Sequence, residues 1–231
     1  AITNGLNLFG GLKAFSGGFF VFSDYMKPAI RMAALMKVPS VFIFSHDSLM
    51  VGEDGPTHEP VEQLIGLRSI PNCNVIRPAD ARETYEALKI AFTSHETPTV
   101  VVLSRQNLKT IETNGELVNK GAYVVRDCID PKYILLATGS EVSLAYEVSK
   151  HIDGVRVVSM PNLDRFLKQD KEYIEQVIPV EFRKIVVEAA SSYSWGKIIF
   201  NSKYLITLDE FGASGKKDDV YKKYGFDIES L

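Results

Sequence analysis

The sequence predicts an α/β protein with two domains, each built on a mostly parallel sheet flanked by helices. Short β-branched and apolar runs alternate with helix-length amphipathic segments along the chain, which is typical of parallel sheets. A polar segment at residues 106–120, with the turn-forming pair Asn114-Gly115, separates these runs into two sets. A chain of 231 residues is long enough for two domains of ordinary size.

The first set of segments precedes the polar segment. Each apolar run is short enough to be a buried strand, and each longer segment has apolar residues spaced as on one face of a helix. In chain order we expect strands at 19–22, 40–44, 74–77 and 99–103, with helices at 25–36, 61–70 and 81–93 between them. These segments form a first domain at residues 1–108.

The second set follows a linker at residues 109–120 and forms a second domain at residues 121–231. We expect strands at 121–127, 133–137, 155–160, 184–188 and 204–207, and helices at 141–151, 171–178 and 218–224.

The composition excludes several classes of protein. With 45% hydrophobic residues, 24% charged residues and a net charge of -3, the chain is a soluble globular protein. Its lysines and arginines are scattered, so no nucleic-acid partner is expected. The apolar runs are too short for a membrane span or a signal peptide. Two distant cysteines, Cys73 and Cys128, indicate neither a disulfide framework nor a zinc site, which fits the cytoplasm.

The most unusual segment is the loop at residues 46–58, which follows the expected strand at 40–44. Ligands of open α/β sheets collect at the carboxyl ends of strands, so this loop lies where a site is expected. Such a loop suits the binding of a polyhydroxylated ligand or the transfer of protons. Its titratable residues are His46, Asp47, Glu53, Asp54 and His58.

Three simpler interpretations of the loop stand beside this one. Its histidines can cap the following helix and bond to loop carbonyls. A metal site with His46, Asp54 and His58 as ligands is the second, although this spacing matches no recurring zinc or calcium loop. In the third, Asp54 with His58, like Asp80 with Thr84, is a pair at the start of a helix.

An aromatic cluster and an arginine complete the candidates. Buried packing is the default expectation for most of the aromatic residues, and a stacking wall for a flat heteroaromatic ligand is the alternative. Arg105 follows the expected strand at 99–103, at the same sheet edge as His46, and suits bidentate recognition of phosphate. A surface cation beside the linker explains Arg105 equally well. The aromatic residues are Phe15, Phe19, Phe20, Phe22 and Tyr25.

Several segments together resemble the transketolase family. The run Val-Gly-Glu-Asp-Gly-Pro-Thr-His-Glu-Pro at residues 51–60 is similar to a characteristic loop of that family. Around it, in family order, lie Ser45-His46-Asp47-Ser48, Arg77-Pro78-Ala79-Asp80-Ala81 and Leu-Ser-Arg-Gln-Asn-Leu at 103–108. In the second half the resemblance continues through Leu-Ala-Thr-Gly-Ser-Glu-Val at 136–142, Met160-Pro161 and Phe211-Gly212-Ala213-Ser214.

The resemblance implies a fold and a role for each candidate residue. The first domain would be a pyrimidine-binding domain of a thiamine-diphosphate enzyme, incomplete at its N-terminus, and the second a transketolase C-terminal domain. Phe19, Phe22 and Tyr25 would surround the aminopyrimidine ring of the cofactor, with Phe22 stacking on it most directly. His46 and His58 would be the catalytic contacts to the sugar chain.

Two further residues take substrate-binding roles under the same resemblance. Asp54 would bond a hydroxyl of the acceptor, and Arg105 would hold the terminal phosphate. The whole enzyme would move two-carbon ketol units between sugar phosphates of the pentose phosphate pathway, as a homodimer with thiamine diphosphate and Mg²⁺ or Ca²⁺.

The family's catalytic glutamate, its diphosphate and metal ligands and a Gly-Asp-Gly motif are not found in this sequence. We therefore expect the chain to be a truncated piece that holds no metal, binds no cofactor alone and is inactive. We also expect the first sheet to have an exposed edge. Alternatives are a related ketol-transferring enzyme, such as dihydroxyacetone synthase or 1-deoxyxylulose-5-phosphate synthase, a natural subunit of a split enzyme, and a non-catalytic binding subunit of transketolase descent.

Overall fold

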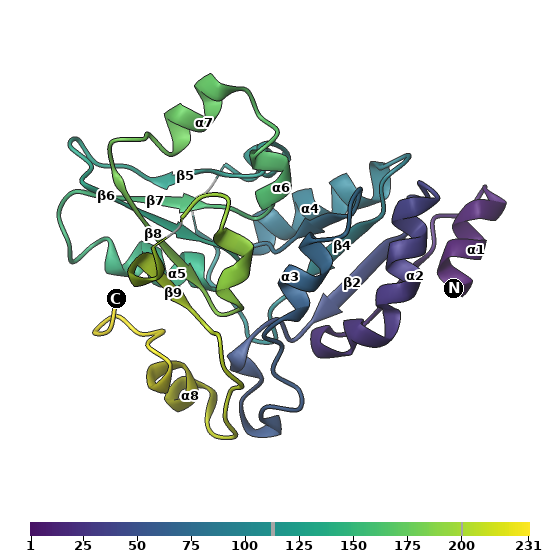
Figure 1. The fold of residues 1–231 in the computed structure, drawn as a ribbon, viewed down its shortest axis with the longest axis horizontal. Helices are drawn as coiled ribbons and strands as arrows, with labels where there is room; N and C mark the ends of the chain where they lie inside the picture. The colour runs from purple at the N-terminus through teal and green to yellow at the C-terminus, as the bar shows by residue number, and fades with distance from the viewer. Residues whose placement is uncertain (112–113, 200) are drawn as a thin grey trace.

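The computed structural model describes residues 1–111, 114–199 and 201–231, and it contains two sheets that lie beside each other (Figure 1). The first sheet has the strand order β1-β2-β4-β3 and is entirely parallel. The second has the order β5-β7-β6-β8-β9, in which only the β5-β7 pair is antiparallel. The predicted fold class, two mostly parallel α/β units, is therefore confirmed. Residues 112 and 113 of the predicted linker lie outside the described residues.

In the first sheet, side-chain alternation along the strands separates two layers of core. The even-numbered residues Phe42 and Val100 face helices α2 and α3, whereas Val41 and Val101 face α4 on the other side. Asp80 caps α4 by accepting a bond from the Glu83 amide at 2.9 Å, as one interpretation of the sequence predicts. The elements are α1 Ile2–Phe9, β1 Phe15–Phe19, α2 Ser23–Leu35, β2 Val41–Ser45, α3 Gln63–Arg68, β3 Asn74–Ile76, α4 Ala81–Thr93 and β4 Thr99–Val102.

The second sheet is covered in the same way. Leu135 and Val157 pack toward α5 and α8, and Leu136 and Val158 pack toward α6 and α7. The elements are β5 Tyr123–Arg126, β6 Tyr133–Ala137, α5 Glu141–Val148, β7 Val155–Ser159, α6 Leu163–Phe166, α7 Lys171–Val177, β8 Arg183–Glu188, β9 Leu205–Thr207 and α8 Lys217–Lys223.

One predicted strand is wrong in its position. The expected strand at 19–22 corresponds to β1, which ends at Phe19, and Phe20–Phe22 form a turn of 3-10 helix instead. Strand β1 shows no apolar pattern in the sequence because Gly17 and Gly18 have no side chains to pack. Helices α1 and α6 are not predicted by the sequence. The expected exposed edge is present, since β1 lies at the end of the first sheet and four of its residues are exposed.

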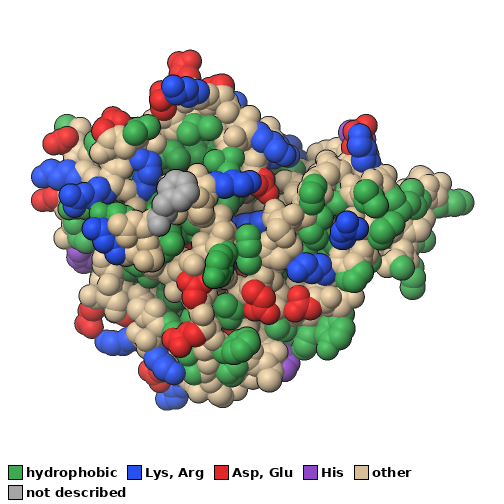
Figure 2. All heavy atoms as spheres, viewed as in Figure 1, with side chains coloured by type: hydrophobic (Ala, Val, Ile, Leu, Met, Phe, Trp, Pro, Cys, Tyr) green, Lys and Arg blue, Asp and Glu red, His purple; other side chains and the backbone are tan. Residues whose placement is uncertain are grey.

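The surface agrees with the scattered charge pattern of the sequence. Figure 2 shows lysine, arginine and acidic side chains interspersed over one face of the molecule. None of the described helices has the length and apolar character needed to cross a membrane.

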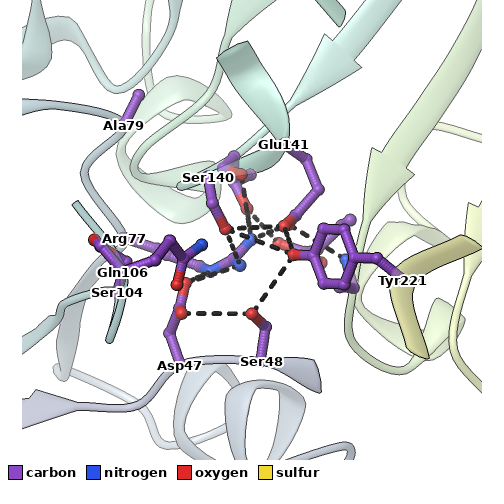
Figure 3. Close-up of polar contacts among 12 residues, drawn as sticks. Asp47, Ser48, Arg77, Ala79, Ser104, Gln106, Ser140, Glu141 and Tyr221 are labelled. Atoms are coloured by element: carbon purple, nitrogen blue, oxygen red, sulfur yellow. Dashed lines mark hydrogen bonds and ion pairs between the residues drawn. The ribbon is translucent and has the colours of Figure 1, made fainter. Parts of the chain in front are cut away.

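The two sheet units meet at a buried cluster of charges centred on Arg77, which follows β3 (Figure 3). Arg77 Nε donates to Asp47 Oδ2 at 2.9 Å in the first unit. Its Nη1 pairs with Glu141 and donates to the Thr138 hydroxyl at 2.9 Å in the second unit. The Tyr221 hydroxyl of α8 donates to Glu141 Oε1 at 2.5 Å. One guanidinium therefore joins carboxylates of both units.

The charges in this cluster act on one another. Burial, with the like charge of Glu141, raises the pKa of Asp47 above its usual value, although the charge of Arg77 lowers it. Burial alone would lower the pKa of Arg77, but the negative charges of Glu141 and Asp47 raise it well above its usual value. Burial, followed by the charge of Glu141, raises the pKa of Tyr221, so its hydroxyl stays protonated and can donate. Gly139 makes room for the cluster, because a Cβ at that position would lie 2.7 Å from Arg77 Cζ.

Removing the guanidinium should destabilise the protein strongly. Arg77→Met keeps an unbranched side chain but leaves Asp47 and Glu141 buried without their shared cation. We expect the free energy of unfolding to fall by about 3–5 kcal/mol, measured by urea denaturation at pH 7. The control is Arg156→Met, which breaks a partly exposed pair with Asp127 and should cost about 1 kcal/mol or less. Equal losses in the two variants would contradict this account.

Candidate active site

The candidate site lies at the carboxyl edge of the first sheet. Strands β1, β2 and β4 are neighbours in that sheet, and Phe19 is in register with Ser45 at the ends of β1 and β2. The predicted residues therefore lie at the ends of three adjacent strands at the same edge: Phe19 ends β1, and His46 and Arg105 follow β2 and β4. Parallel strands place ligand-binding loops at this edge in open α/β sheets.

His46 turns away from the buried residue that follows it. Its backbone has φ of 64°, in the left-handed region that few residues other than glycine adopt. This turn leaves the imidazole partly exposed while Asp47 is buried against Arg77. The Ser45 hydroxyl lies 2.9 Å from His46 Nδ1. The sequence singles out Asp47 only as part of a polar loop. In the structure, the contact of Asp47 with Arg77 holds the backbone next to His46 in place.

Four of the five aromatic side chains are exposed, so the default expectation that most would be buried is wrong. Phe20 is 1% exposed, whereas Phe19 is 36%, Phe22 40% and Tyr25 85% exposed, and Phe15 is exposed at the edge strand. The Phe19 ring stacks on His46 at 3.7 Å between centroids. Phe22 contacts His58 edge-on at 5.4 Å and Tyr25 at 6.2 Å. Three aromatic rings and two imidazoles thus form one surface cluster.

Burial and nearby charged groups shift the pKa of His46. Burial lowers the pKa of His46, and the positive charge of Arg105 lowers it further. The negative charge of Asp54 acts in the opposite direction. The structure therefore brings His46, Asp54 and Arg105 within electrostatic range of one another, although no direct hydrogen bond joins them among the described contacts.

The loop between His46 and His58 is held by the second sheet unit. It contains a 3-10 segment, Leu49–Asp54, which packs against α8. The Ser214 hydroxyl donates to the Glu53 carbonyl at 2.7 Å. The Thr57 hydroxyl lies 2.9 Å from His58 Nδ1. Neither histidine caps a helix, and Asp54 ends a 3-10 segment rather than starting a helix, so the helix-start interpretation is wrong for Asp54.

Glu59, which follows His58, is a buried carboxyl group at this junction. It is 2% exposed and lies against Gly212, where an added Cβ would approach Glu59 Oε2 to 1.9 Å. Burial raises the pKa of Glu59 to about 7, and the Ala213 amide and the charge of Lys223 oppose this effect only in part.

The described residues include no group of three or more histidine, cysteine or acidic residues placed to hold a metal ion. The alternative ligand set of His46, Asp54 and His58 is therefore not supported by the structure.

No sequence pattern assigns a role to Arg77, Glu141 or Tyr221. Arg77 and Glu141 lie within segments that carry the family resemblance, but only the fold shows that they share a buried cluster with Asp47 (Figure 3). The available signal was a charged residue directly after an apolar strand, which is equally typical of a surface position.

Two parallel-dominated α/β units, with aromatic rings and imidazoles at the carboxyl edge of the first, define an open α/β protein whose candidate ligand site lies where such sheets bind ligands. The family model described as "Transketolase, pyrimidine binding domain" matches residues 1–110, and the model "Transketolase-like TK C-terminal domain" matches residues 121–227. Together they match nearly the whole chain, and the chain belongs to the transketolase family.

Similar proteins support this assignment over the full chain. It is 49% identical over 241 residues to a transketolase of Staphylococcus aureus strain MW2, and 48% identical over 242 residues to one of Bacillus subtilis strain 168. Each alignment covers 100% of this chain and 36% of the relative. A crystal structure of transketolase from Campylobacter jejuni superposes with a TM-score of 0.93 at 42% identity, covering 100% of this chain and 36% of that one. The chain thus spans about a third of the length of these relatives.

The proton affinity of His46 should respond in opposite directions to its two charged neighbours. We expect its pKa to lie below the ordinary 6.5, to rise in Arg105→Gln and to fall in Asp54→Asn. Imidazole NMR titration measures this directly, because the chain has only four histidines. His151, which follows α5 in the second unit, supplies the internal reference signal. A shift of His46 in the same direction in both variants would refute this arrangement of charges.

Glu59 should make stability depend on pH. Below pH 4.5 the Glu59 carboxyl is protonated in both the folded and the unfolded protein. Between about pH 4.5 and 7 it loses its proton in the unfolded protein but keeps it in the folded one. Deprotonation therefore favours the unfolded state, and the free energy of unfolding falls as pH rises through this range. Glu59→Gln removes this titration and should be ~1–3 kcal/mol more stable than the original protein at pH 8, and little different at pH 4.5. Urea denaturation at the two pH values checks this, with the exposed Glu62→Gln as the control. A gain that is the same at both pH values would count against a raised pKa.

Proposed function

We propose that this protein takes part in the transketolase reaction, in which a two-carbon ketol unit passes from a ketose phosphate to an aldose phosphate with thiamine diphosphate as cofactor. The observation that carries the proposal is the cluster of exposed aromatic rings and two imidazoles at one sheet edge. Alignments that cover 100% of this chain and 36% of proteins named transketolase support it.

The exposed rings suit a flat heteroaromatic group such as the aminopyrimidine ring of thiamine diphosphate. One face of Phe19 is covered by His46, so Phe22 and Tyr25 offer the more accessible surface for stacking. When bound, the cofactor supplies the nucleophilic carbon needed to break the C–C bond beside the ketose carbonyl. Mg²⁺ or Ca²⁺ would accompany its diphosphate, and we assign no metal ligand to this chain.

The polar residues of the cluster would position the sugar. The lowered pKa of His46 favours a neutral imidazole at pH 7, which can both donate and accept a hydrogen bond to substrate oxygens. His58 lies across the aromatic rings from His46 and would contact the same part of the sugar. Asp54 would accept a bond from a hydroxyl, and Arg105 would hold the terminal phosphate. These contacts accelerate the reaction by orienting it.

We also propose that these 231 residues do not turn over substrate alone. The chain spans 36% of its relatives, and the resemblance assigns the diphosphate ligands, metal ligands and catalytic glutamate to segments not found here. Activity would then need a longer polypeptide, acting as a cytoplasmic homodimer in the pentose phosphate pathway. Dihydroxyacetone synthase, 1-deoxyxylulose-5-phosphate synthase and a non-catalytic subunit are not favoured, because the relatives that match the whole chain are named transketolases.

The direct test compares this chain with the longest polypeptide that its gene encodes. Each is incubated with xylulose 5-phosphate, ribose 5-phosphate, thiamine diphosphate and Mg²⁺, and product formation is measured. Turnover by the longer polypeptide but not by the 231 residues supports the proposal. Absence of ketol transfer in both, with either donor or acceptor varied, would reject the transketolase activity.

Arg105 gives the sharper prediction in the active polypeptide. If its guanidinium binds the substrate phosphate, Arg105→Gln should raise KM for phosphorylated substrates by about 10–100-fold and change kcat much less. The matched control is Lys109→Gln, an exposed cation four residues away that should leave both constants unchanged. A fall in kcat without a change in KM would place Arg105 outside the phosphate contact.

A further inference from the structure

A cavity of about 700 Å³ lies between the two sheet units, away from the candidate active site. On the first unit its wall includes residues 70–73 and Thr97, which precede β3 and β4, and Asn74, which begins β3, so it lies at the amino edge of that sheet. On the second unit its wall includes Asn162 and Lys197, which follow β7 and β8 at the carboxyl edge. The latter edge is where open α/β sheets commonly bind ligands.

The wall of this cavity has a net positive charge, although Asp164 pairs with Lys197 at 3.9 Å and Glu188 pairs with Arg68. It includes Arg68, Arg165, Lys168 and Lys197, and Asp164 is the one acidic residue among the described residues that line it. This excess of positive charge occurs in a chain whose net charge is -3. In Figure 2, lysine and arginine side chains lie beside the notch between the two lobes, near α6. A concave surface of one sign raises the local concentration of ligands of the opposite sign.

Arg68 is buried in this wall, and Arg165 is half-buried. The Arg68 side chain is 5% exposed, and its two terminal nitrogens bond Glu188 at 3.0 and 2.9 Å. Its Nε is buried and has no acceptor among the described residues, although such donors nearly always have one. Among the described contacts, the Arg165 guanidinium donates to oxygens of the neutral Asn119 and has no acidic partner, and burial lowers the pKa of Arg165. An anionic oxygen in the cavity would give Arg165 a charged partner.

The remaining wall suits a small hydroxylated molecule. It offers amide groups of Asn72, Asn74 and Asn119 and hydroxyl groups of Ser94 and Thr97. The volume falls within the range typical of small-molecule sites. We propose that this cavity binds a phosphate-bearing small metabolite, with its phosphate at Arg68, Arg165, Lys168 and Lys197. The site is separate from the candidate active site and does not depend on the proposed function.

Binding can be observed at Arg68 itself. The 231-residue chain is titrated at low ionic strength with ribose 5-phosphate, and with ribose as the neutral probe. We expect saturable binding of the phosphate with a Kd of about 1 mM or tighter, no binding of ribose, and a shift of the Arg68 Nε–H signal in ¹⁵N NMR spectra. No saturation, or saturation without a change at Arg68, would overturn the proposal.

Matched variants separate this site from other phosphate contacts. The double variant Lys168→Gln with Lys197→Gln removes two cavity cations from exposed positions and should weaken binding at least ~10-fold. Lys171→Gln with Lys203→Gln removes the same charge away from the cavity and should bind as the original chain does. Binding should also persist in Arg105→Gln. Loss in Arg105→Gln but not in the cavity variant would assign the phosphate to the candidate active site instead.

Discussion

The burial of one positive charge between two carboxylates is the constraint on which the rest of this structure depends. Arg77 is almost fully buried, and Asp47 from one sheet unit and Glu141 from the other compensate its charge. A buried ion without such partners costs several kcal/mol, so the two units are held in one mutual arrangement. That arrangement fixes the peptide at Asp47, and with it the position of His46. It also sets the walls of the cavity on the other side of the junction.

Much of the fold could be predicted from local pattern. The helix at 81–93 coincides with α4, and the strand at 133–137 coincides with β6, because both have strong apolar periodicity and clear ends. Strand β1 was misplaced because Gly17 and Gly18 give it no pattern, and it is stabilised by backbone pairing with β2 rather than by burial. Helix α1 contains Asn4, Gly5 and Asn7, which have low helix propensity, and contacts such as Asn4 to the Ala29 carbonyl hold it in place.

The location of the candidate site could be predicted from the sequence, but the buried contacts that hold its residues in place could not. A polar loop after a buried strand indicates a site, and the structure brings His46, His58 and the aromatic rings together there. The exposure of Phe19 and Phe22 depends on where β1 ends, which the sequence placed wrongly. Glu141, which pairs with Arg77 from the second unit, lies 64 residues away in the chain, and no local sequence pattern can specify such a pairing.

The placement of His46 and Asp47 on adjacent residues has a consequence for recombining domains. The His46 ring lies in the candidate site, and the adjacent Asp47 carboxylate lies in the buried charge cluster between the two sheet units. The site in the first unit is therefore coupled to the second unit. A hybrid protein could join this first domain to the C-terminal domain of another protein. That C-terminal domain would need a glutamate at the position of Glu141 to pair with Arg77, a tyrosine at the position of Tyr221 to bond the glutamate, and a glycine at the position of Gly139. Compatibility at those three positions, more than overall similarity, would decide whether such a hybrid assembles a usable site.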